Sequence, residues 1–225
     1  MEVACISKST LFFLESLKEN NNKEWFESHK AEYKHQQDLI KRFFKQVMLT
    51  LRTHDEITDL KVFRIYRDVR FSHDKTPYKR YFACSFKRAK PHLRGGYYLH
   101  IEPRNSFLVC GFWAPEKNDI KRIRKEFEVD ALEVRSIVNH PEFKHHFGQL
   151  KGDELKTAPR GFDKAHPDMD LIKKKQWIVT KEFTDSQILA ENFASEVDKA
   201  YQAIRPFFDY MSDVLTTDLN GTSLL

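Results

Sequence analysis

No run in this chain approaches the roughly 20 consecutive apolar residues that a transmembrane helix requires. The apolar run nearest the N-terminus, 11–14, is also too short for the apolar region of a secretory signal peptide, and no small-residue cleavage site follows it. These absences predict a protein without a membrane span, and we expect it to be cytoplasmic.

Cysteine is scarce and unpaired in pattern. Cys5, Cys84 and Cys110 are odd in number, lie far apart and form no CxxC pair. The cysteine pattern therefore indicates neither a disulfide framework nor a zinc knuckle. Cys84 and Cys110 fall within strand-like runs, where a packing role is expected rather than a catalytic one.

The common catalytic and nucleotide-binding signatures are missing as well. The chain has no HExxH, no P-loop, no glycine pattern of a dinucleotide-binding fold and no G-x-S-x-G. No nucleophile stands out either, since Ser72 has no base partner recognisable in the sequence. The sequence alone does not decide whether the protein is an enzyme, and it indicates no cofactor with a strong motif.

What the chain does contain is enough for one sizeable core. Apolar residues make up 40% of its 225 residues, and 19 of them are Phe, which predicts a core rich in aromatic packing. A chain of this length is within the range of a single domain, and no repeat or low-complexity linker divides it. We expect one domain over residues 1–225.

Apolar periodicity predicts the elements of that domain. Helical patterning covers 9–19, about 22–53, 116–128, 130–139 and the C-terminal part of the chain. Strand-like segments are 63–71, 78–87, 97–102, 107–113 and 176–183, and 148–170 is irregular. Asn21, with Glu24 three residues later, fits a helix cap. The expected class is α+β, an antiparallel sheet of about five strands flanked by N-terminal and C-terminal helices.

Positive charge is concentrated in the middle of the chain. Between Lys61 and Arg104 there are 12 Lys and Arg against 3 acids, a surplus of nine, although the net charge of the whole chain is only +5. If these charges share one face, they attract phosphate or carboxylate groups. If they are spread over several solvated faces, they indicate no anion-binding surface.

The segment 63–71 holds the most unusual arrangement. On a strand, Arg64, Asp68 and Arg70 would point to one side, and Arg67 would point to the apolar side. A charge on an apolar face needs a partner, and guanidinium pairs best with carboxylate or phosphate. Asp68, Asp74, Asp163 or a bound anion could be that partner.

A polar turn follows this segment and extends the candidate site. Ser72, Lys75 and the backbone amides around them could hold an anion beside the strand, and Arg160, Asp163 and His166 could close over it. The predicted ligand-binding residues are Arg64, Arg67, Arg70, Ser72, Lys75, Tyr78, Lys79, Arg160 and Asp163. Binding of a phosphate- or carboxylate-bearing small molecule is the leading hypothesis.

Three other hypotheses stay open. In a catalytic version, Asp68 or Asp74 is the base and His166 carries a proton. With Asp163 and Asp168 these residues would suit Mg²⁺ or Mn²⁺, but their spacing does not require a metal and we assign no ligand.

Nucleic-acid binding would use basic residues interleaved with aromatic ones, and it predicts an extended basic surface with exposed aromatics. A structural or interaction protein instead predicts an internally paired Arg67 and no pocket. The sequence gives no oligomeric state.

One long motif resembles a known family. The run Phe63–Lys79 (FRIYRDVRFSHDKTPYK) is distinctive, and it is accompanied by Asn21-Asn22, Glu24-Trp25-Phe26, Gly96-Tyr97-Tyr98, Trp113 with Pro115, Pro159-Arg160-Gly161-Phe162-Asp163 and His166-Pro167. Together these resemble an uncharacterised family of conserved hypothetical proteins with a domain of unknown function. The resemblance covers about 10–210 and implies an α+β domain in a cytosolic protein. It implies no activity.

Overall fold

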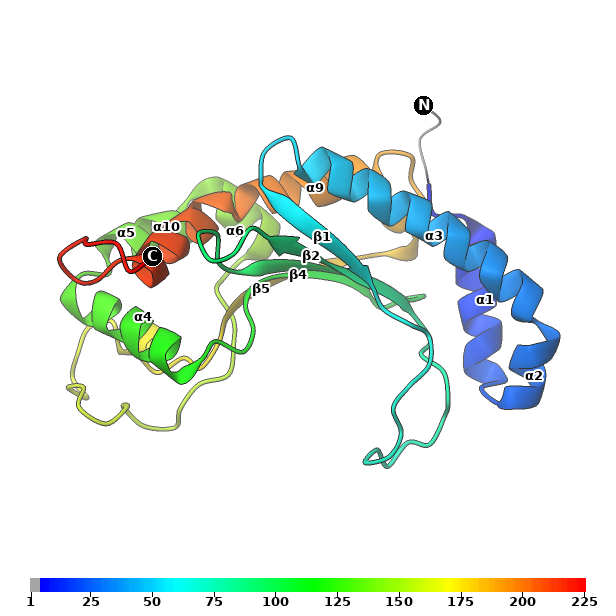
Figure 1. The fold of residues 1–225 in the computed structure, drawn as a ribbon, viewed down its shortest axis with the longest axis horizontal. Coiled ribbons are helices and arrows are strands. Elements are labelled where there is room, and N and C mark those ends of the chain that lie inside the picture. The colour runs from blue at the N-terminus through cyan, green and yellow to red at the C-terminus, as the bar shows by residue number, and fades with distance from the viewer. Residues whose placement is uncertain (1–4) are drawn as a thin grey trace. The chain divides into compact units, whose positions relative to one another are not determined.

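A computed structural model describes residues 5–225, and its helices and strands are labelled in Figure 1. The helices are α1 (Lys8–Glu19), α2 (Lys23–Ser28), α3 (Lys30–Leu51), α4 (Lys117–Val129), α5 (Leu132–Asn139), α6 (Pro141–Phe147), α7 (Met169–Ile172), α8 (Asp185–Ile188), α9 (Phe193–Ala203) and α10 (Arg205–Thr216). The strands are β1 (Ile57–Val62), β2 (Phe82–Arg88), β3 (Gly96–Ile101), β4 (Ser106–Phe112) and β5 (Trp177–Phe183).

The five strands form one antiparallel sheet in the order β1-β2-β3-β4-β5. This confirms the α+β class and the number of strands expected. The predicted hairpin is formed by β3 and β4. Its turn places Arg104 at a φ of 62°, in the left-handed region that residues other than glycine seldom occupy.

Local chemistry explains where several helices begin. The predicted helix 22–53 is interrupted at His29, which caps the end of α2 and the start of α3. Asn22, not Asn21, caps α2, because its side chain accepts a hydrogen bond from the Trp25 amide at 2.9 Å. Pro141 and Pro206 each stand in the first turn of a helix, where a missing N–H costs nothing.

The contacts of the chain divide it into two units, which are described here one by one. Unit 1 consists of residues 1–87, 98–108 and 182–199, and unit 2 of residues 88–97, 109–181 and 200–225. The expectation of one domain over the whole chain stays a prediction.

Unit 1 is built around aromatic rings, as the Phe content predicts. Helix α3 packs on α1 and on strand β1. The Phe43 ring of α3 lies 5.6 Å from the Phe193 ring of α9, and the Phe26 ring of α2 stacks at 3.9 Å on Tyr78. This last contact brings the N-terminal helices to the segment that carries the candidate site.

Unit 2 has a core of its own around α10. The Phe208 ring packs edge-on against Tyr97 at 5.0 Å and against Phe112 at 6.0 Å. The segment 148–168 is irregular, as expected, and two isolated bridges join Lys151 to Ile178 and Glu154 to Lys174.

The structure bears on two predictions, the one about membrane spans and the one about the cysteines. None of the helices within residues 5–225 combines the length and the apolar character that a membrane crossing needs. All three cysteines are free, and Cys84 of β2 and Cys110 of β4 are fully buried. Burial raises the pKa of both thiols well above the ordinary value, which fits their predicted packing role.

Candidate functional site

The prediction of a strand over 63–71 is wrong. The strand that precedes the motif is β1, and residues 63–81 form an extension that we call the arm, two antiparallel segments that run out beyond β1 and β2 and turn back (Figure 1). The segments are joined at a single bridge between Tyr66 and Tyr78, and by hydrogen bonds from the Arg67 amide to the Pro77 carbonyl (2.9 Å) and from the Lys79 amide to the Ile65 carbonyl (2.7 Å).

Side chains replace the missing ladder. Pro77 has no N–H to donate, so a continuous pairing with the first segment is impossible there. Instead Lys75 donates to the Val69 carbonyl at 3.1 Å, and Lys79 donates to the carbonyl of Arg64 at 2.9 Å. The arm keeps the burial alternation that suggested a strand, but its backbone groups are satisfied mostly by side chains.

Asn21 fastens the arm to the N-terminal helices. Its side chain donates to the Tyr78 carbonyl at 2.9 Å and accepts from the Tyr78 amide at 3.0 Å. The prediction that Asn21 caps a helix is therefore wrong. Asn21 instead binds the returning segment of the arm, where the Tyr78 ring also stacks on Phe26.

Arg67 is the hub of the arm's tip. Its guanidinium donates to the Asp74 carboxylate at 2.6 Å, to the Thr76 carbonyl at 3.0 Å, to the Thr76 hydroxyl and to the Ser72 hydroxyl at 3.3 Å. The partner that the sequence required for Arg67 is thus Asp74, within the arm itself. Ser72 is bound to Arg67, and both serve the turn.

Both acids of the arm, Asp68 and Asp74, are held by hydrogen bonds and ion pairs. Asp74 accepts from the Thr76 amide and hydroxyl, and these bonds, with the Arg67 ion pair, lower the pKa of Asp74 to about 2. Asp68 pairs with Arg70 at 2.6 Å, which lowers the pKa of Asp68. Both carboxylates are therefore ionised at neutral pH and held by cations, which is unfavourable for a base.

A cleft of about 380 Å³ lies at the arm. Its lining residues are Arg67, Asp68, Asp74, Tyr78, Lys79, Arg80, Tyr81 and Glu102. Five of them were predicted, and Arg80, Tyr81 and Glu102 were not. Three cations and three carboxylates line this space, so the cleft is polar and mixed in charge, not uniformly basic.

Glu102 ends a chain of hydrogen bonds that the sequence reasoning missed. Tyr98, His100 and Glu102 lie at alternate positions from β3 onwards, and this spacing was the available signal. The Tyr98 hydroxyl lies 2.9 Å from His100 Nδ1, and His100 Nε2 lies 3.1 Å from Glu102 Oε2. Burial lowers the pKa of His100, against the opposing effect of Glu102, so the ring is neutral at pH 7.

Three cations of the arm, Arg64, Lys75 and Lys79, form no ion pair among the described residues, and Lys75 makes only the bond to the Val69 carbonyl already described. Arg64 is exposed, and Lys79 makes only the backbone bond already described and contacts the rings of Phe63 and Tyr81. Burial, and then the charges of Arg64 and Lys61, lower the pKa of Lys79. Positive charge is therefore in local surplus around Lys79, although Arg64 also acts electrostatically on Asp68.

The later residues of the prediction belong to unit 2. Arg160 and Asp163 are exposed, and Asp163 accepts a hydrogen bond from the Ala165 amide at 2.9 Å. His166 Nδ1 accepts from the Asp168 amide at 3.1 Å, within the local turn, and Nε2 contacts the Glu128 carbonyl of α4 at 3.2 Å, so both nitrogens have partners within unit 2. The expectation that these residues close over the arm joins the two units and stays a prediction.

Three of the acids proposed for a metal, Asp68, Asp74 and Asp168, form ion pairs with arginines. Asp168 and Asp170 both pair with Arg135, as Asp68 and Asp74 pair with arginines of the arm. In residues 5–225, no three His, Cys, Asp or Glu side chains gather in a way that would hold a metal ion.

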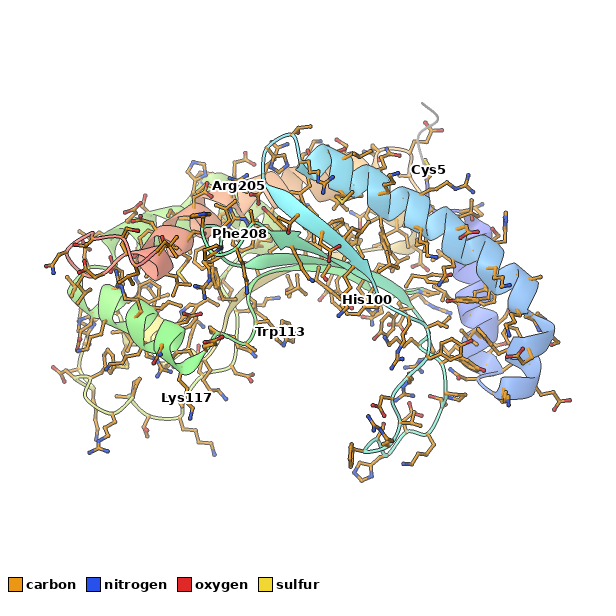
Figure 2. All side chains as sticks on the ribbon, viewed as in Figure 1. Cys5, His100, Trp113, Lys117, Arg205 and Phe208 are labelled. Atoms are coloured by element: carbon orange, nitrogen blue, oxygen red, sulfur yellow. The ribbon has the colours of Figure 1, made fainter. Side chains whose placement is uncertain are left out.

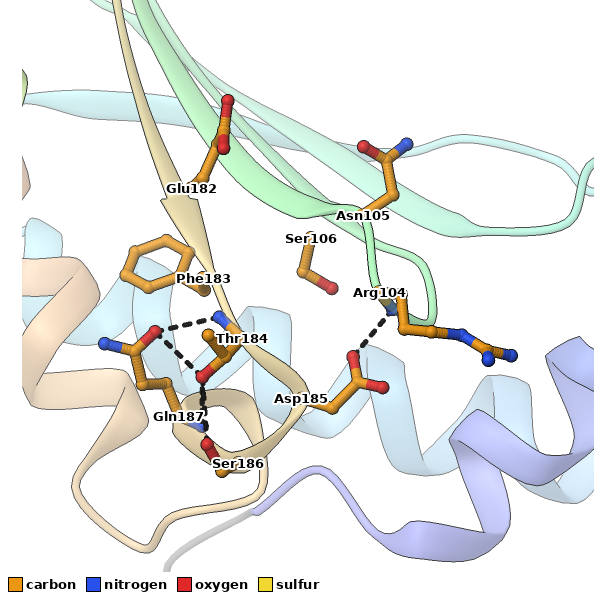
Figure 3. A pocket seen from close by; sticks show the side chains of 9 residues that line it. All are labelled: Arg104, Asn105, Ser106, Glu182, Phe183, Thr184, Asp185, Ser186 and Gln187. Carbon is orange, nitrogen blue, oxygen red and sulfur yellow. Dashed lines mark hydrogen bonds between the residues drawn. The ribbon is translucent and has the colours of Figure 1, made fainter.

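A second cleft, of about 530 Å³, lies between the β3–β4 turn and the start of α8 (Figure 3). Its polar groups are used locally: the Arg104 amide donates to Asp185 at 2.7 Å, and Thr184 and Gln187 bond reciprocally at the cap of α8. The same turn supplies Asn105, whose amide donates to Glu102 at 2.8 Å. This cleft thus supports the arm cleft more than it offers a site of its own.

Among known proteins, the chain matches a family model. No curated protein and no solved structure matches it. A family model does match over residues 9–210, which is most of the chain and includes the arm, the β3–β4 hairpin and the irregular segment. The chain therefore belongs to the family described as conserved hypothetical protein (DUF2461), as its long arm motif indicated.

Proposed function

We propose that the arm cleft binds a small molecule that carries a phosphate or a carboxylate. The observation that carries this proposal is Lys79, which lines a cleft of about 380 Å³, forms no ion pair, and lies close enough to the exposed Arg64 for that charge to lower its pKa. A space of this size suits a small metabolite, since ligand pockets start at about 300 Å³. In keeping with the free, buried Cys84 and Cys110, we place this binding in the cytoplasm.

The lowered pKa of Lys79 supports the same proposal. The neighbouring charges of Arg64 and Lys61 disfavour the protonated amine, after burial, which is the largest cause. An anion seated between these groups reverses the repulsion and offsets the cost of desolvation. Binding of the anion and protonation of Lys79 therefore favour each other.

Lys79→Met tests the proposal. Wild-type protein is melted with inorganic phosphate, nucleotides, sugar phosphates and dicarboxylates, and one class is expected to raise the Tm by about 5 °C or more at a hundredfold excess over Kd. The shift should be lost in Lys79→Met and reduced in Arg64→Met. Lys45→Met, which removes an exposed charge from α3 in the same unit, should keep it.

Two results would reject the proposal. One is the absence of any ligand-dependent shift in the wild type, and the other is an equal shift in Lys79→Met and wild type. Arg160→Met, run in the same series, tests whether unit 2 contributes to the site. Loss of the shift in that variant would establish the predicted closure by the irregular segment.

Nucleic-acid binding is the second candidate, because one observation favours it. Phe71 at the tip of the arm is 96% exposed, Tyr66 is 45% exposed, and the segment 61–81 holds seven Lys or Arg against two Asp. Stacking of unpaired bases on such rings, with phosphates on the cations, is a known binding mode. Oligonucleotide binding that weakens steeply with salt and is lost in Phe71→Ala would favour this candidate over a small molecule.

The structural alternative has support too. Arg67 is fully paired within the arm, as a cluster that only holds the fold requires, although the cleft beside it was not expected in that case. Lys79→Met separates the two views if its Tm without ligand is also measured, because Lys79 donates to the Arg64 carbonyl. Loss of the ligand-dependent shift at an unchanged starting Tm supports binding, and a lowered starting Tm supports the structural role.

A further inference from the structure

The bonds inside the arm cleft decide which of its charges can reach a ligand. Arg67 is used by Asp74 and Thr76, and Asp68 is used by Arg70. What is left of the three cations and three carboxylates is Lys79 and the loose pair of Arg80 and Glu102, whose Nε and Oε1 atoms lie 4.0 Å apart. The cleft thus offers two cations and one carboxylate to an occupant.

Glu102 is held in place from several sides. Its Oε2 atom lies 3.1 Å from His100 Nε2 and 2.8 Å from the amide nitrogen of Asn105, which donates to it. Its backbone is fixed by Ser106, whose hydroxyl accepts from the Glu102 amide at 3.1 Å and donates to the Glu102 carbonyl at 2.8 Å. The carboxylate is therefore preorganised before any ligand arrives.

His100 makes this arrangement directional. A neutral imidazole has one N–H, and an ionised carboxylate can only accept, so the proton of His100 is on Nε2. Nδ1 is then an acceptor, and it receives the Tyr98 hydroxyl at 2.9 Å. The His100 ring also lies against Phe107 and Tyr81, with ring centroids 4.5 Å and 4.1 Å apart, and it is buried on the sheet (Figure 2).

The other oxygen of Glu102 is unused. Oε1 faces Arg80 Nε at 4.0 Å, beyond hydrogen-bond distance, and no described residue donates to it. The Glu102 side chain is 16% exposed, and it lines the cleft. A carboxylate oxygen with free lone pairs that opens into a cleft invites a donor from the occupant.

From these contacts we infer that Glu102 Oε1 accepts a hydrogen bond from a hydroxyl or ammonium group that the ligand carries beside its anionic group. Glu102 is then a ligand-binding residue, and His100 and Tyr98 are positioning residues behind it. The ligand class narrows from any small anion to hydroxylated or amino-bearing phosphates and carboxylates. This inference rests on the proposed function, because the same ligand must also meet Lys79.

Three matched compounds test it: n-propyl phosphate, 3-hydroxypropyl phosphate and 3-aminopropyl phosphate. They share the anion and the chain length and differ only in the terminal group. By calorimetry, wild type should bind the hydroxyl or the amino compound about tenfold more tightly than propyl phosphate. The compound that gains tells whether the natural group is neutral or charged.

Glu102→Gln is the decisive variant. It keeps the shape and removes the charge, so the preference for the amino compound should fall to about twofold or less while the Kd for propyl phosphate stays within about twofold of wild type. Glu102→Asp, which withdraws the carboxylate by one methylene, should also lose the preference, and it replaces Glu102→Gln if that variant does not fold.

The role of His100 has its own readout. In ¹⁵N NMR spectra of the wild type, the ring should be neutral with its proton on Nε2, and the Nε2 signal should move with the amino or hydroxyl compound but not with propyl phosphate. Tyr98→Phe should weaken the preference without changing propyl phosphate binding, an effect that a merely structural role would not produce.

The outcomes separate the two claims. This inference is wrong and the proposed function stands if propyl phosphate binds and depends on Lys79, but wild type shows no preference, Glu102→Gln retains a preference for the amino compound, or Glu102→Asp retains a preference for the hydroxyl compound. If none of the three compounds binds, or if Lys79→Met binds them all equally well, the proposed function fails and this inference falls with it.

Discussion

Arg67 of unit 1 and Arg88 of unit 2 both belong to the basic segment between Lys61 and Arg104, but their surroundings differ. The Arg88 side chain is 0% exposed, bonds the Arg94 carbonyl at 2.6 Å, Ser212 and Asp209, and lies over the Phe208 ring at 4.9 Å. The Arg67 side chain is 23% exposed and bonds only residues of its own arm.

The basic residues of one stretch of sequence thus serve three different purposes. Arg88 joins the end of β2 to α10 inside a core, and Arg67 closes a loop at the surface. Lys79 and Arg80 line the arm cleft and hold no carboxylate within hydrogen-bond distance, so they are the cations available to a ligand there. Counting charges finds the stretch, but only the partners of each charge tell its purpose.

The largest effect is expected from Arg88→Met. Removal of this buried cation leaves the Arg94 carbonyl without its side-chain donor and ends the ion pair with Asp209, and we expect a loss of about 3 kcal/mol in the free energy of unfolding. Urea denaturation followed by circular dichroism measures it. Arg70→Met, which breaks an exposed pair, is the control and should leave the midpoint unchanged. Equal midpoints for both variants would contradict the contrast.

A smaller and local effect is expected from Arg67→Met. Because the arm's tip depends on this one side chain, its opening should become more frequent while the global midpoint changes little. Trypsin should cut at Arg70 or Lys75 about tenfold faster than in wild type under native conditions.

Arg64→Met is the matched control for that experiment, since Arg64 has no ionic partner among the described residues. Its arm should be cut at the wild-type rate. If Arg67→Met is cut no faster than this control, the tip is held by something other than the Arg67 hub.

The smallest effect is expected at low pH, where protonation of Asp74 weakens the bonds that hold the tip of the arm. The folded pKa of Asp74 is about 2, below the value of about 3.9 expected in an unfolded chain, so the stabilisation is complete above about pH 4 and is lost as the pH falls towards 2. The Asp74 carboxyl carbon, followed by ¹³C NMR, should titrate near pH 2. In Thr76→Val, which lacks the hydroxyl donor, the midpoint should rise. A wild-type midpoint near 4 would show that the tip is open.

Much of the fold could be predicted because its signals are local. Apolar period and turn residues were sufficient for α1, the β3–β4 hairpin and β5, and for the α+β class. Strand β1 was missed because its exposed positions resemble a loop, while 63–71 has the alternation of a strand but a partner segment interrupted by Pro77.

The candidate site was predicted in part for a similar reason. The run from Arg64 to Lys79 is contiguous, so the sequence shows it directly. Glu102 lies on the hairpin and reaches the cleft only through the pairing of the strands, which no local pattern specifies. Its unused oxygen depends on which donors surround it, and such an arrangement can be recognised only in three dimensions.

The bond pair between Asn21 and Tyr78 has a mechanical consequence for the cleft. Tyr78, Lys79 and Tyr81 lie on the part of the arm that this clasp ties to the N-terminal helices. Asp68 and Asp74 lie beyond it, on a tip that is held by the Arg67 hub. We therefore expect the wall of the cleft formed by Tyr78, Lys79 and Tyr81 to be rigid. The wall formed by Asp68 and Asp74 depends on Arg67 for its conformation, so it should be the more mobile of the two, although both walls belong to the same arm.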